Sequence, residues 1–275
     1  MQTVLTIAGF DPSSGAGVTA DLMVFAAHDL FGASCITNLT VQSTTGVVET
    51  HPVSAHIVRA TLDCISSDLS IAGIKIGMLS TKFTVDTVAD FLASLRGERA
   101  RIPVVLDPVI RSSSGRELLE PAGVALMIKR LLPLVDWIAP NVDELSLLSG
   151  TSVRSREDVL RASQIIQRLS ANLNIFATGG HLNPPDDLVL TAKGEAHWLP
   201  GEHISSQSTH GTGCALSSAL LSRLVEGYEP HAAALASKAY VAEAIRTATP
   251  IGSGNGPLNH LWPLQHGSVI RSCSR

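Results

Sequence analysis

The chain has 275 residues, 45% of them hydrophobic and 16% charged, and a formal net charge of −4 at pH 7. This length suits one large domain, and the apolar composition is typical of a sheet buried on both faces by helices. The weak acidic charge, without a long basic run, argues against a nucleic-acid groove or a membrane surface and favours small-molecule partners.

Cysteine usage and the first residues predict a cytoplasmic protein without a membrane anchor. No C-x-x-C pair is formed by the cysteines, which are Cys35, Cys64, Cys214 and Cys273. The N-terminus enters a strand-like sequence directly, without the charged and apolar regions of a signal peptide. No apolar run reaches the roughly 18 residues that a membrane-spanning helix requires.

The chain opens on a strand, a glycine-rich loop and a helix. Residues 4–8 form a β-branched apolar run, residues 9–17 the loop, and a helical pattern follows from 18 to about 28. Residues 15–20 match the G-x-G-x-x-A form of a dinucleotide fingerprint. The next strand, 33–41, is followed by Gln42 and offers no carboxylate for a ribose, so the sequence argues against a nicotinamide enzyme.

Alternating helices and strands continue through the middle of the chain. We expect helices over 54–69 and 82–95, a short buried strand over 73–79, and a strand over 103–109. Asp107 lies near the end of that last strand. Because open parallel sheets bind ligands outside the carboxyl ends of their strands, Asp107 is a candidate site residue, and a turn aspartate before proline is the structural alternative.

After a helix predicted over 117–132, a strand breaks at Pro140 and another helix begins. Asn141 can cap that helix, with Glu144 as its capping-box partner. The functional alternative is that Asn141 and Glu144 hold a hydrated Mg²⁺ through oxygen ligands. Both can be true.

The C-terminal half predicts a helix over 155–169, a strand over 174–178 and a β-hairpin over 188–199 that acts as a flap near the site. Helices follow from Ala215 and over 231–247. A glycine-rich loop covers 251–257, and 265–275 form a loose tail, so that 1–264 make a single domain.

A glycine turn at residues 208–216 precedes the helix that starts at Ala215. Gly211 and Gly213 bracket a threonine there, and the free N–H groups of a helix N-terminus bind anions. Cys214 stands at the mouth of this predicted anion hole. The structural alternative is an ordinary loop-to-helix junction with a buried cysteine.

Six segments occur together and in order: 8–17, 75–79, 105–109, 140–144, 179–181 and 209–214. Taken jointly, they closely resemble the hydroxymethylpyrimidine/phosphomethylpyrimidine kinases of thiamine biosynthesis, within the ribokinase-like superfamily. The resemblance implies a three-layer αβα sandwich with a mainly parallel central sheet. It also implies ATP and Mg²⁺, γ-phosphoryl transfer to a pyrimidine, and a homodimer.

The resemblance assigns roles to individual positions. Gly211, Thr212 and Gly213 would form the catalytic anion hole, and Cys214 would replace a catalytic aspartate. The predicted substrate-binding residues are Gly9, Asp21, Gln42, Met78, Val109 and His210, the ATP-binding residues are Asn141, Thr178, Thr209 and Lys238, and the metal ligands are Asp107 and Glu144.

Two departures from the family pattern stand out. The family usually has lysine before Gly-Gly-His, whereas this chain has Thr178, so Lys238 and the metal are expected to carry the phosphate charge instead. The first loop reads Asp-Pro-Ser-Ser-Gly, with Ser14 where the family more often has glycine, and we expect little effect from this change.

The helix N-terminus is expected to lower the pKa of Cys214, so that a thiolate accepts the proton of an alcohol substrate. A monophosphate acceptor needs no strong base. Three alternatives remain: a pyridoxal or pyridoxine kinase of the same superfamily, a cysteine hydrolase using Cys214 and His210, and a non-catalytic pyrimidine-binding protein.

Overall fold

The computed structural model describes residues 1–98, 102–112, 115–180 and 182–267. His181 and Cys273, which the sequence analysis singled out, lie outside these ranges. None of the described helices combines the length and apolar character that crossing a membrane requires.

One sheet of nine strands organises the described residues, in the order β3-β2-β1-β4-β5-β6-β7-β8-β9. The pairs from β2 through β7 are parallel, and β2–β3, β7–β8 and β8–β9 are antiparallel. The strands are β1 (Thr3–Phe10), β2 (Phe31–Ser43), β3 (Gly46–Pro52), β4 (Ile71–Ile76), β5 (Val104–Leu106), β6 (Trp137–Ile138), β7 (Asn174–Ala177), β8 (Asp187–Leu190) and β9 (Ala196–Leu199).

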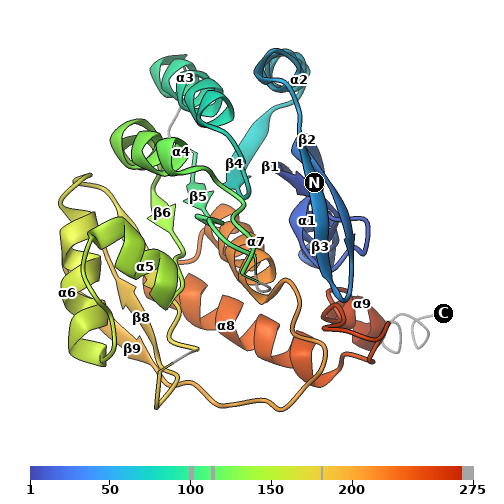
Figure 1. Cartoon of the computed structure of the whole chain (residues 1–275), viewed down its shortest axis with the longest axis vertical. Helices are drawn as coiled ribbons and strands as arrows, with labels where there is room; N and C mark the ends of the chain where they lie inside the picture. The colour runs from blue at the N-terminus through green and yellow to red at the C-terminus, as the bar shows by residue number, and fades with distance from the viewer. Residues whose placement is uncertain (99–101, 113–114, 181, 268–275) are drawn as a thin grey trace.

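Helices connect most of the parallel strands, as the alternating sequence pattern predicts (Figure 1). They are α1 (Gly17–Ala27), α2 (Ala55–Asp68), α3 (Lys82–Glu98), α4 (Pro121–Leu126), α5 (Val142–Ser149), α6 (Arg156–Gln167), α7 (Thr212–Val225), α8 (Pro230–Arg246) and α9 (Trp262–Gly267). A π-helical turn and a 3₁₀ turn extend α4 to residue 134. The structure confirms an α/β fold with a mainly parallel central sheet.

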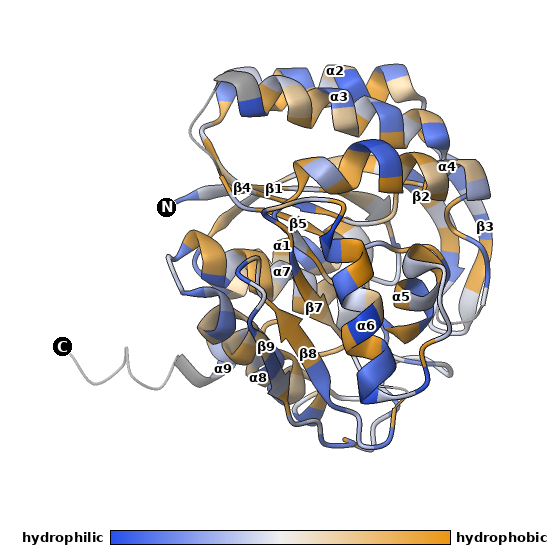
Figure 2. Ribbon diagram, turned by 90° about the vertical axis from the view of Figure 1, so that its left-hand side faces the viewer, coloured by the Kyte–Doolittle hydropathy of each residue, from blue (hydrophilic) through white to orange (hydrophobic). Residues whose placement is uncertain are grey.

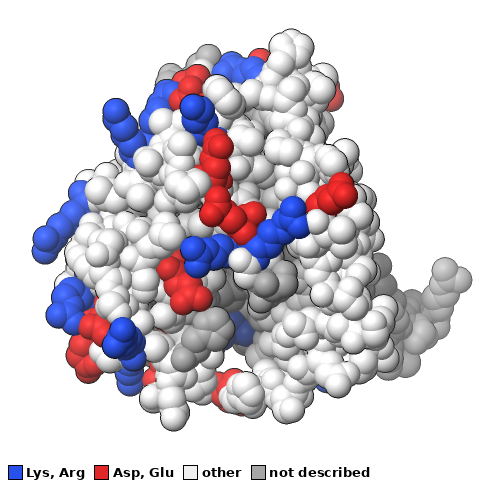
Figure 3. Space-filling view, viewed as in Figure 1, with Lys and Arg blue, Asp and Glu red and all other residues white. Residues whose placement is uncertain are grey.

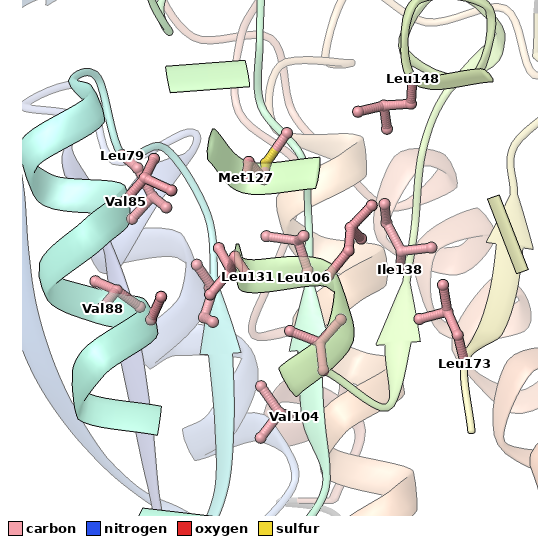
Figure 4. Packing of buried hydrophobic residues seen from close by; sticks show 14 of the residues in the cluster. Leu79, Val85, Val88, Val104, Leu106, Met127, Leu131, Ile138, Leu148 and Leu173 are labelled. Atoms are coloured by element: carbon pink, nitrogen blue, oxygen red, sulfur yellow. The ribbon is translucent and has the colours of Figure 1, made fainter. Parts of the chain in front are cut away.

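Two apolar clusters lie on opposite faces of this sheet. Successive strand residues alternate between them: Leu106 packs with α3 and the extension of α4, whereas Val105 packs with α7 and α8 (Figure 4). In Figure 2 the central strands have the colour of apolar residues and most helices show both colours, which is typical of helices that cover a buried sheet.

Three sequence predictions differ from the structure. The helix predicted over 117–132 begins at Pro121, because proline suits the first turn of a helix but not its interior. The hairpin over 188–199 is not a flap, because β8 and β9 continue the central sheet beside β7. Residues 265–267 of the predicted tail belong to α9, and the rest of that tail lies outside the described residues.

The ribbon next to the site is made instead by β2 and β3, which stand at the edge of the sheet (Figure 1). The sequence pattern did not predict β3. Its turn, residues 43–46, lines a cavity at the carboxyl ends of the parallel strands. The β2–β3 ribbon therefore lies where the sequence predicted the hairpin over 188–199 to act as a flap.

Candidate active site

A cavity of about 290 Å³ opens at the carboxyl ends of the parallel strands, here called the main cavity. Its walls come from the ends of β1 and β5, the β2–β3 turn, and the N-termini of α5 and α7. The face shown in Figure 3 is hollowed near its middle, and charged side chains border the hollow. Predicted site residues that line the main cavity are Gly9, Gln42, Met78, Asp107, Val109, Asn141, Glu144, Thr178, Thr209, His210, Gly211, Thr212, Gly213 and Cys214.

The glycine turn forms the N-terminus of α7, one turn earlier than the sequence analysis expected. Gly211 is the N-cap residue, with a φ of 87° that favours glycine. A Cβ atom at Gly211 would lie 1.8 Å from the carbonyl oxygen of Gly15, so a side chain cannot fit there. The first N–H groups of α7, at Thr212 and Gly213, therefore face the main cavity on a helix whose following turns are buried.

Cys214 is a neutral thiol, and the expected thiolate is wrong. Burial raises the pKa of Cys214 to about 12, and the negative charges of Asp107 and Asp21 oppose ionisation further. The opposing effects, from Lys75 and from a hydrogen bond donated by the Gly17 N–H, are smaller. Burial thus outweighs the helix N-terminus. The Cys214 thiol is hydrogen-bonded to the Asp107 carboxyl.

Asp107 and Glu144 lie close together in the wall of the main cavity, with 5% and 7% of their surface exposed. Burial raises the pKa of Glu144 to about 8, and the charge of Asp107 contributes to that shift. Burial also raises the pKa of Asp107, despite the attraction of Lys75. A nearby cation would stabilise the ionised form of both carboxyl groups and so lower their pKa values. The described residues contain no group of three or more His, Cys, Asp or Glu arranged to hold a metal ion.

The predicted capping box at α5 is confirmed. The Asn141 side chain accepts the Glu144 N–H at 2.9 Å, and the Glu144 carboxylate accepts the Asn141 N–H at 3.0 Å. The second oxygen of Glu144 accepts only a long bond of 3.5 Å from the N–H of Ile110. Capping therefore fixes Glu144 at the cavity wall and leaves one of its oxygens weakly engaged.

A buried cation, Lys75, lies beneath this wall, and the sequence analysis gave it no role. Its Nζ atom lies 3.0 Å from both carboxylate oxygens of Asp21 and 4.0 Å from Asp107. Burial alone would lower the pKa of Lys75, but attraction to these carboxylates outweighs it and holds the pKa above its ordinary value. Lys75 lines the main cavity and carries a permanent charge at its floor.

Asp21 was predicted to bind substrate, and the structure contradicts this. Its carboxylate is fully buried, does not line the main cavity, and accepts hydrogen bonds from Lys75, Thr6 and Ser218. Asp21 can act on a ligand only through Lys75. The motif that contains Lys75 was visible in the sequence, but the pairing of two residues 54 positions apart was not.

Gln42 and His210 form the other end of the main cavity, together with Asp11. His210 Nε2 lies 2.8 Å from an oxygen of Asp11 and 3.0 Å from the Gln42 amide nitrogen. One ring nitrogen cannot both donate to Asp11 and accept from Gln42. The shorter contact, to Asp11, leaves the amide N–H groups of Gln42 available to a ligand, while the Gln42 oxygen accepts the Thr40 hydroxyl at 3.2 Å. Burial would raise the pKa of Asp11, but hydrogen bonds from His210 and Ser13 hold it below its ordinary value.

The geometry does not support the cysteine hydrolase. A nucleophilic thiolate needs a base hydrogen-bonded to it, but among the described residues His210 contacts Asp11 and Gln42 rather than Cys214, and burial raises the pKa of Cys214.

Lys238 lies apart from the main cavity, in an adjoining cavity of about 640 Å³ that we call the α8 cavity. Its Nζ lies 2.7 Å from Asp187 and 3.0 Å from the carbonyl oxygen of Leu199. The α8 cavity also touches Thr178 and Gly213, so it is continuous with the N-terminus of α7. The charge of Lys238 is largely neutralised by Asp187, which weakens the expectation that it replaces the family lysine.

The second departure, Ser14, does have a structural effect. Ser14 adopts a φ of 58°, in the left-handed region that glycine enters freely. A serine in that region is strained by roughly 1 kcal/mol. The loop nevertheless keeps its turn, in which the Ser14 N–H donates to the carbonyl oxygen of Asp11 at 3.0 Å.

A mainly parallel α/β sheet, a glycine-capped helix N-terminus and two buried carboxylates at one cavity are the arrangement expected of a phosphoryl-transferring enzyme of the ribokinase-like class. The comparisons with known proteins agree. A family model described as phosphomethylpyrimidine kinase matches residues 11–259. The chain belongs to this family, and it is a kinase.

Individual relatives cover almost the whole chain. The hydroxymethylpyrimidine/phosphomethylpyrimidine kinase of Rhizobium meliloti (strain 1021) is 40% identical, over 93% of this chain and 96% of that protein. The crystal structure of phosphomethylpyrimidine kinase from Clostridium difficile 630 matches with a TM-score of 0.78 and 32% identity, over 89% of this chain and 100% of that one. Staphylococcus aureus pyridoxal kinase in complex with AMP-PCP and pyridoxal matches with a TM-score of 0.84 and 28% identity, over 95% of this chain and 94% of that one.

Proposed function

We propose that the chain transfers the γ-phosphoryl group of ATP to 4-amino-5-hydroxymethyl-2-methylpyrimidine, to its monophosphate, or to both, and so makes the pyrophosphate used in thiamine biosynthesis. The observation that carries this proposal is the N-terminus of α7, which touches both the main cavity and the α8 cavity. A phosphoryl group held there lies between an acceptor on one side and a nucleotide on the other. The names of the relatives supply the pyrimidine and thiamine assignment.

The proposed substrate site is the Gln42 end of the main cavity. A carboxamide carries both a donor and an acceptor, which suits an aminopyrimidine edge. Gly9, Met78 and Val109 supply the remaining, mostly apolar wall. The side chain of Met78 packs so closely that a Cβ atom at Gly9 would lie 3.0 Å from its sulfur.

The nucleotide is proposed to occupy the α8 cavity, with its phosphates directed toward Thr178, Thr209 and the N-terminus of α7. The fold that supports this arrangement is proposed to be the three-layer αβα sandwich of ribokinase-like enzymes, with helices over both faces of the central sheet. The structural relative with AMP-PCP and pyridoxal bound is consistent with ATP as phosphoryl donor.

Asp107 and Glu144 fit Mg²⁺. Mg²⁺ is usually bound by one or two carboxylates together with substrate phosphates and waters, so a pair of carboxylates is a sufficient protein contribution. Burial raises the pKa of both carboxyl groups even with Lys75 4.0 Å from Asp107, so a bound cation would stabilise their ionised forms. When bound, the cation would neutralise charge on the phosphate groups.

The protein's own groups manage the proton of the acceptor. Cys214, as a thiol, can accept the proton of an alcohol only while its own proton passes to the hydrogen-bonded carboxylate of Asp107. A monophosphate acceptor needs no such transfer, because its oxygens are already largely ionised at neutral pH. Orientation and charge stabilisation by the α7 N-terminus are therefore common to both acceptors, and the proton transfer is not.

Homodimer formation is proposed from the β2–β3 ribbon. Its outer surface exposes Leu39, Val41 and Val48, with 48%, 49% and 64% of their surfaces accessible. Such an apolar group at a sheet edge needs cover. A cytoplasmic location is proposed from the biosynthetic role of the named relatives.

An ADP-release assay with three acceptors tests the function. We expect turnover with hydroxymethylpyrimidine, its monophosphate, or both, at a kcat/KM at least tenfold above that for pyridoxal. Preferential phosphorylation of pyridoxal would assign the chain to the alternative, a pyridoxal or pyridoxine kinase, which the TM-score of 0.84 with the pyridoxal kinase structure favours. No ADP release with any acceptor would reject the kinase proposal and leave the non-catalytic pyrimidine-binding protein.

Magnesium binding is expected to strengthen as pH rises, because it must displace the proton of Glu144. With a pKa raised from 4.5 to about 8, Glu144 is mostly protonated in the metal-free protein at pH 7. We expect the Kd for Mg²⁺ to fall roughly tenfold per pH unit between pH 6 and 7.5, and to level off above pH 8, with about one proton released per ion. Calorimetry in buffers of different ionisation enthalpy measures both quantities.

The same raised pKa gives the sign of a stability effect. The unfolded chain ionises Glu144 from pH 4.5 upward and the folded protein does not, so the metal-free protein loses stability as pH rises toward 8. Glu144→Gln should weaken both pH dependences and leave only the contribution of Asp107, whose pKa is also raised by burial. Asp143→Asn removes an exposed neighbouring carboxylate that makes only the smallest contribution to the raised pKa of Glu144, and should largely preserve them. An Mg²⁺ affinity that does not change with pH in the wild type would contradict this assignment.

A further inference from the structure

Phosphate binding requires positive charge, and few Lys or Arg side chains of the described residues lie near the N-terminus of α7. Besides the main and α8 cavities, a third cavity of about 540 Å³ adjoins the N-terminus of α7, and we call it the α5 cavity because α5 forms one wall. Thr178 and Gly213 line all three cavities. The Lys and Arg side chains that line them are Lys75, Arg111, Lys238 and Arg246.

Three of these four cations are already neutralised. Lys75 is paired with Asp21 and Lys238 with Asp187. Arg246 is paired with Glu202 and Glu243, at the outer end of the α8 cavity. A phosphate could recruit these side chains only in competition with a carboxylate at bonding distance.

Arg111 differs from the other three. Within the described ranges its side chain has no ion pair, and it is exposed to solvent. It lines both the main cavity and the α5 cavity, as do Glu144 and Thr212. A guanidinium there stands at the boundary between the proposed acceptor and the proposed phosphoryl path.

The backbone around Arg111 is fixed even though its side chain is free. Ile110 donates its N–H to Glu144, and its carbonyl oxygen accepts from Leu118 and Leu119 at 2.8 and 3.2 Å. Arg111 itself forms a β-bridge with Glu117. The segment therefore holds the start of the arginine side chain at the cavity rim and leaves the guanidinium to meet a ligand.

We propose that Arg111 is the phosphate-binding cation of this enzyme and supplies the positive charge that Thr178 lacks. Its ligand is a phosphate oxygen, from the nucleotide or from a monophosphate acceptor. A guanidinium binds such oxygens in a bidentate geometry and remains charged at every pH of interest. The proposal rests on the proposed ATP-dependent function.

Variants at the two positions test it. Arg111→Ala should lower kcat/KM for ATP about 10- to 100-fold, the effect of losing one charge-assisted hydrogen bond. Arg111→Lys should retain more activity. In the Arg111→Ala background, Thr178→Lys should raise kcat/KM for ATP at least tenfold. A merely structural role for Arg111 would not allow this recovery. The matched control is Arg154→Ala, an exposed arginine that lines none of the three cavities and should leave the kinetics unchanged.

Kinetics with each acceptor identify which phosphate Arg111 binds. With the alcohol as acceptor, a rise in KM for ATP in Arg111→Ala identifies the nucleotide as the partner. With the monophosphate as acceptor, a selective rise in its own KM identifies the acceptor phosphate. Values within twofold of wild type for both substrates would overturn the proposal.

Failure of the kinase function is distinguishable from failure of this inference. If the wild type releases no ADP with any acceptor, calorimetric binding of ADP and of hydroxymethylpyrimidine monophosphate decides the role of Arg111. Binding of either at least tenfold weaker in Arg111→Ala, with Arg154→Ala unchanged, would still support a phosphate-binding cation. Equal binding by all three proteins, both of ADP and of hydroxymethylpyrimidine monophosphate, would overturn it.

Discussion

Replacing Lys75 with methionine is expected to destabilise the protein by about 3–5 kcal/mol, because it leaves buried carboxylates without a counter-charge. Lys75 and Asp21 are both fully buried and lie 3.0 Å apart, and Asp107 lies 4.0 Å from the same ammonium. Urea unfolding of the metal-free protein at pH 7 measures the change. Activity should fall with it, since the charge of Asp107 then has no internal partner.

The companion variants separate the charge from the volume of the side chain. Asp21→Asn alone leaves Asp107 as the charge partner of Lys75. It should therefore lower the free energy of unfolding by less than Lys75→Met does. The double variant, Lys75→Met with Asp21→Asn, should be more stable than Lys75→Met, because it removes the stranded carboxylate together with its partner. A Lys75→Met protein within 1 kcal/mol of wild type would show that the carboxylates simply become protonated and that the lysine is dispensable.

The fold was largely predictable because its signals are local. Alternation of short apolar runs with helical patterns predicts the order of β1, α1, β2 and most later elements, and Asn141 with Glu144 marks the start of α5 by side-chain chemistry alone. β3 was missed because its sequence, Gly-Val-Val-Glu-Thr-His-Pro, is polar and ends in proline, as an exposed edge strand allows. The placement of the β8–β9 hairpin depends on pairing with β7, which no local pattern reveals.

The residues that line the site could be predicted from the sequence, but their protonation states could not. The glycine turn, Asp107, Glu144 and Gln42 meet at one cavity as expected. The state of Cys214 was predicted wrongly, because a helix N-terminus is visible in sequence whereas the burial that outweighs it is not. The substrate-binding role of Asp21 came from the family resemblance alone. The structure instead shows its carboxylate fully buried, 3.0 Å from the Nζ atom of Lys75.

Two glycines at the start of α7 give the sharpest functional prediction. Replacing Gly213 with alanine should affect activity, whereas replacing Gly211 with alanine should affect stability. Gly213→Ala should keep the fold and lower kcat about 10²-fold, the usual effect of disturbing one anion-hole donor. A Cβ atom there would find nothing closer than 3.9 Å, the distance to an Asp107 oxygen. The methyl group therefore fits the protein without bound substrates. It fills, however, the space between the α7 N–H groups and Asp107, where the phosphoryl group is proposed to pass.

Gly211→Ala should instead destabilise the protein by about 2 kcal/mol or more, because its φ of 87° disfavours alanine and the new Cβ would lie 1.8 Å from the Gly15 carbonyl oxygen. Thermal unfolding and steady-state kinetics on both variants compare the two effects. Alanine is the better helix former, so the unfolding temperature of Gly213→Ala should equal or exceed that of wild type. If this stable variant kept full activity with every acceptor, phosphoryl transfer could not occur at the α7 N-terminus, since the methyl group would block its path.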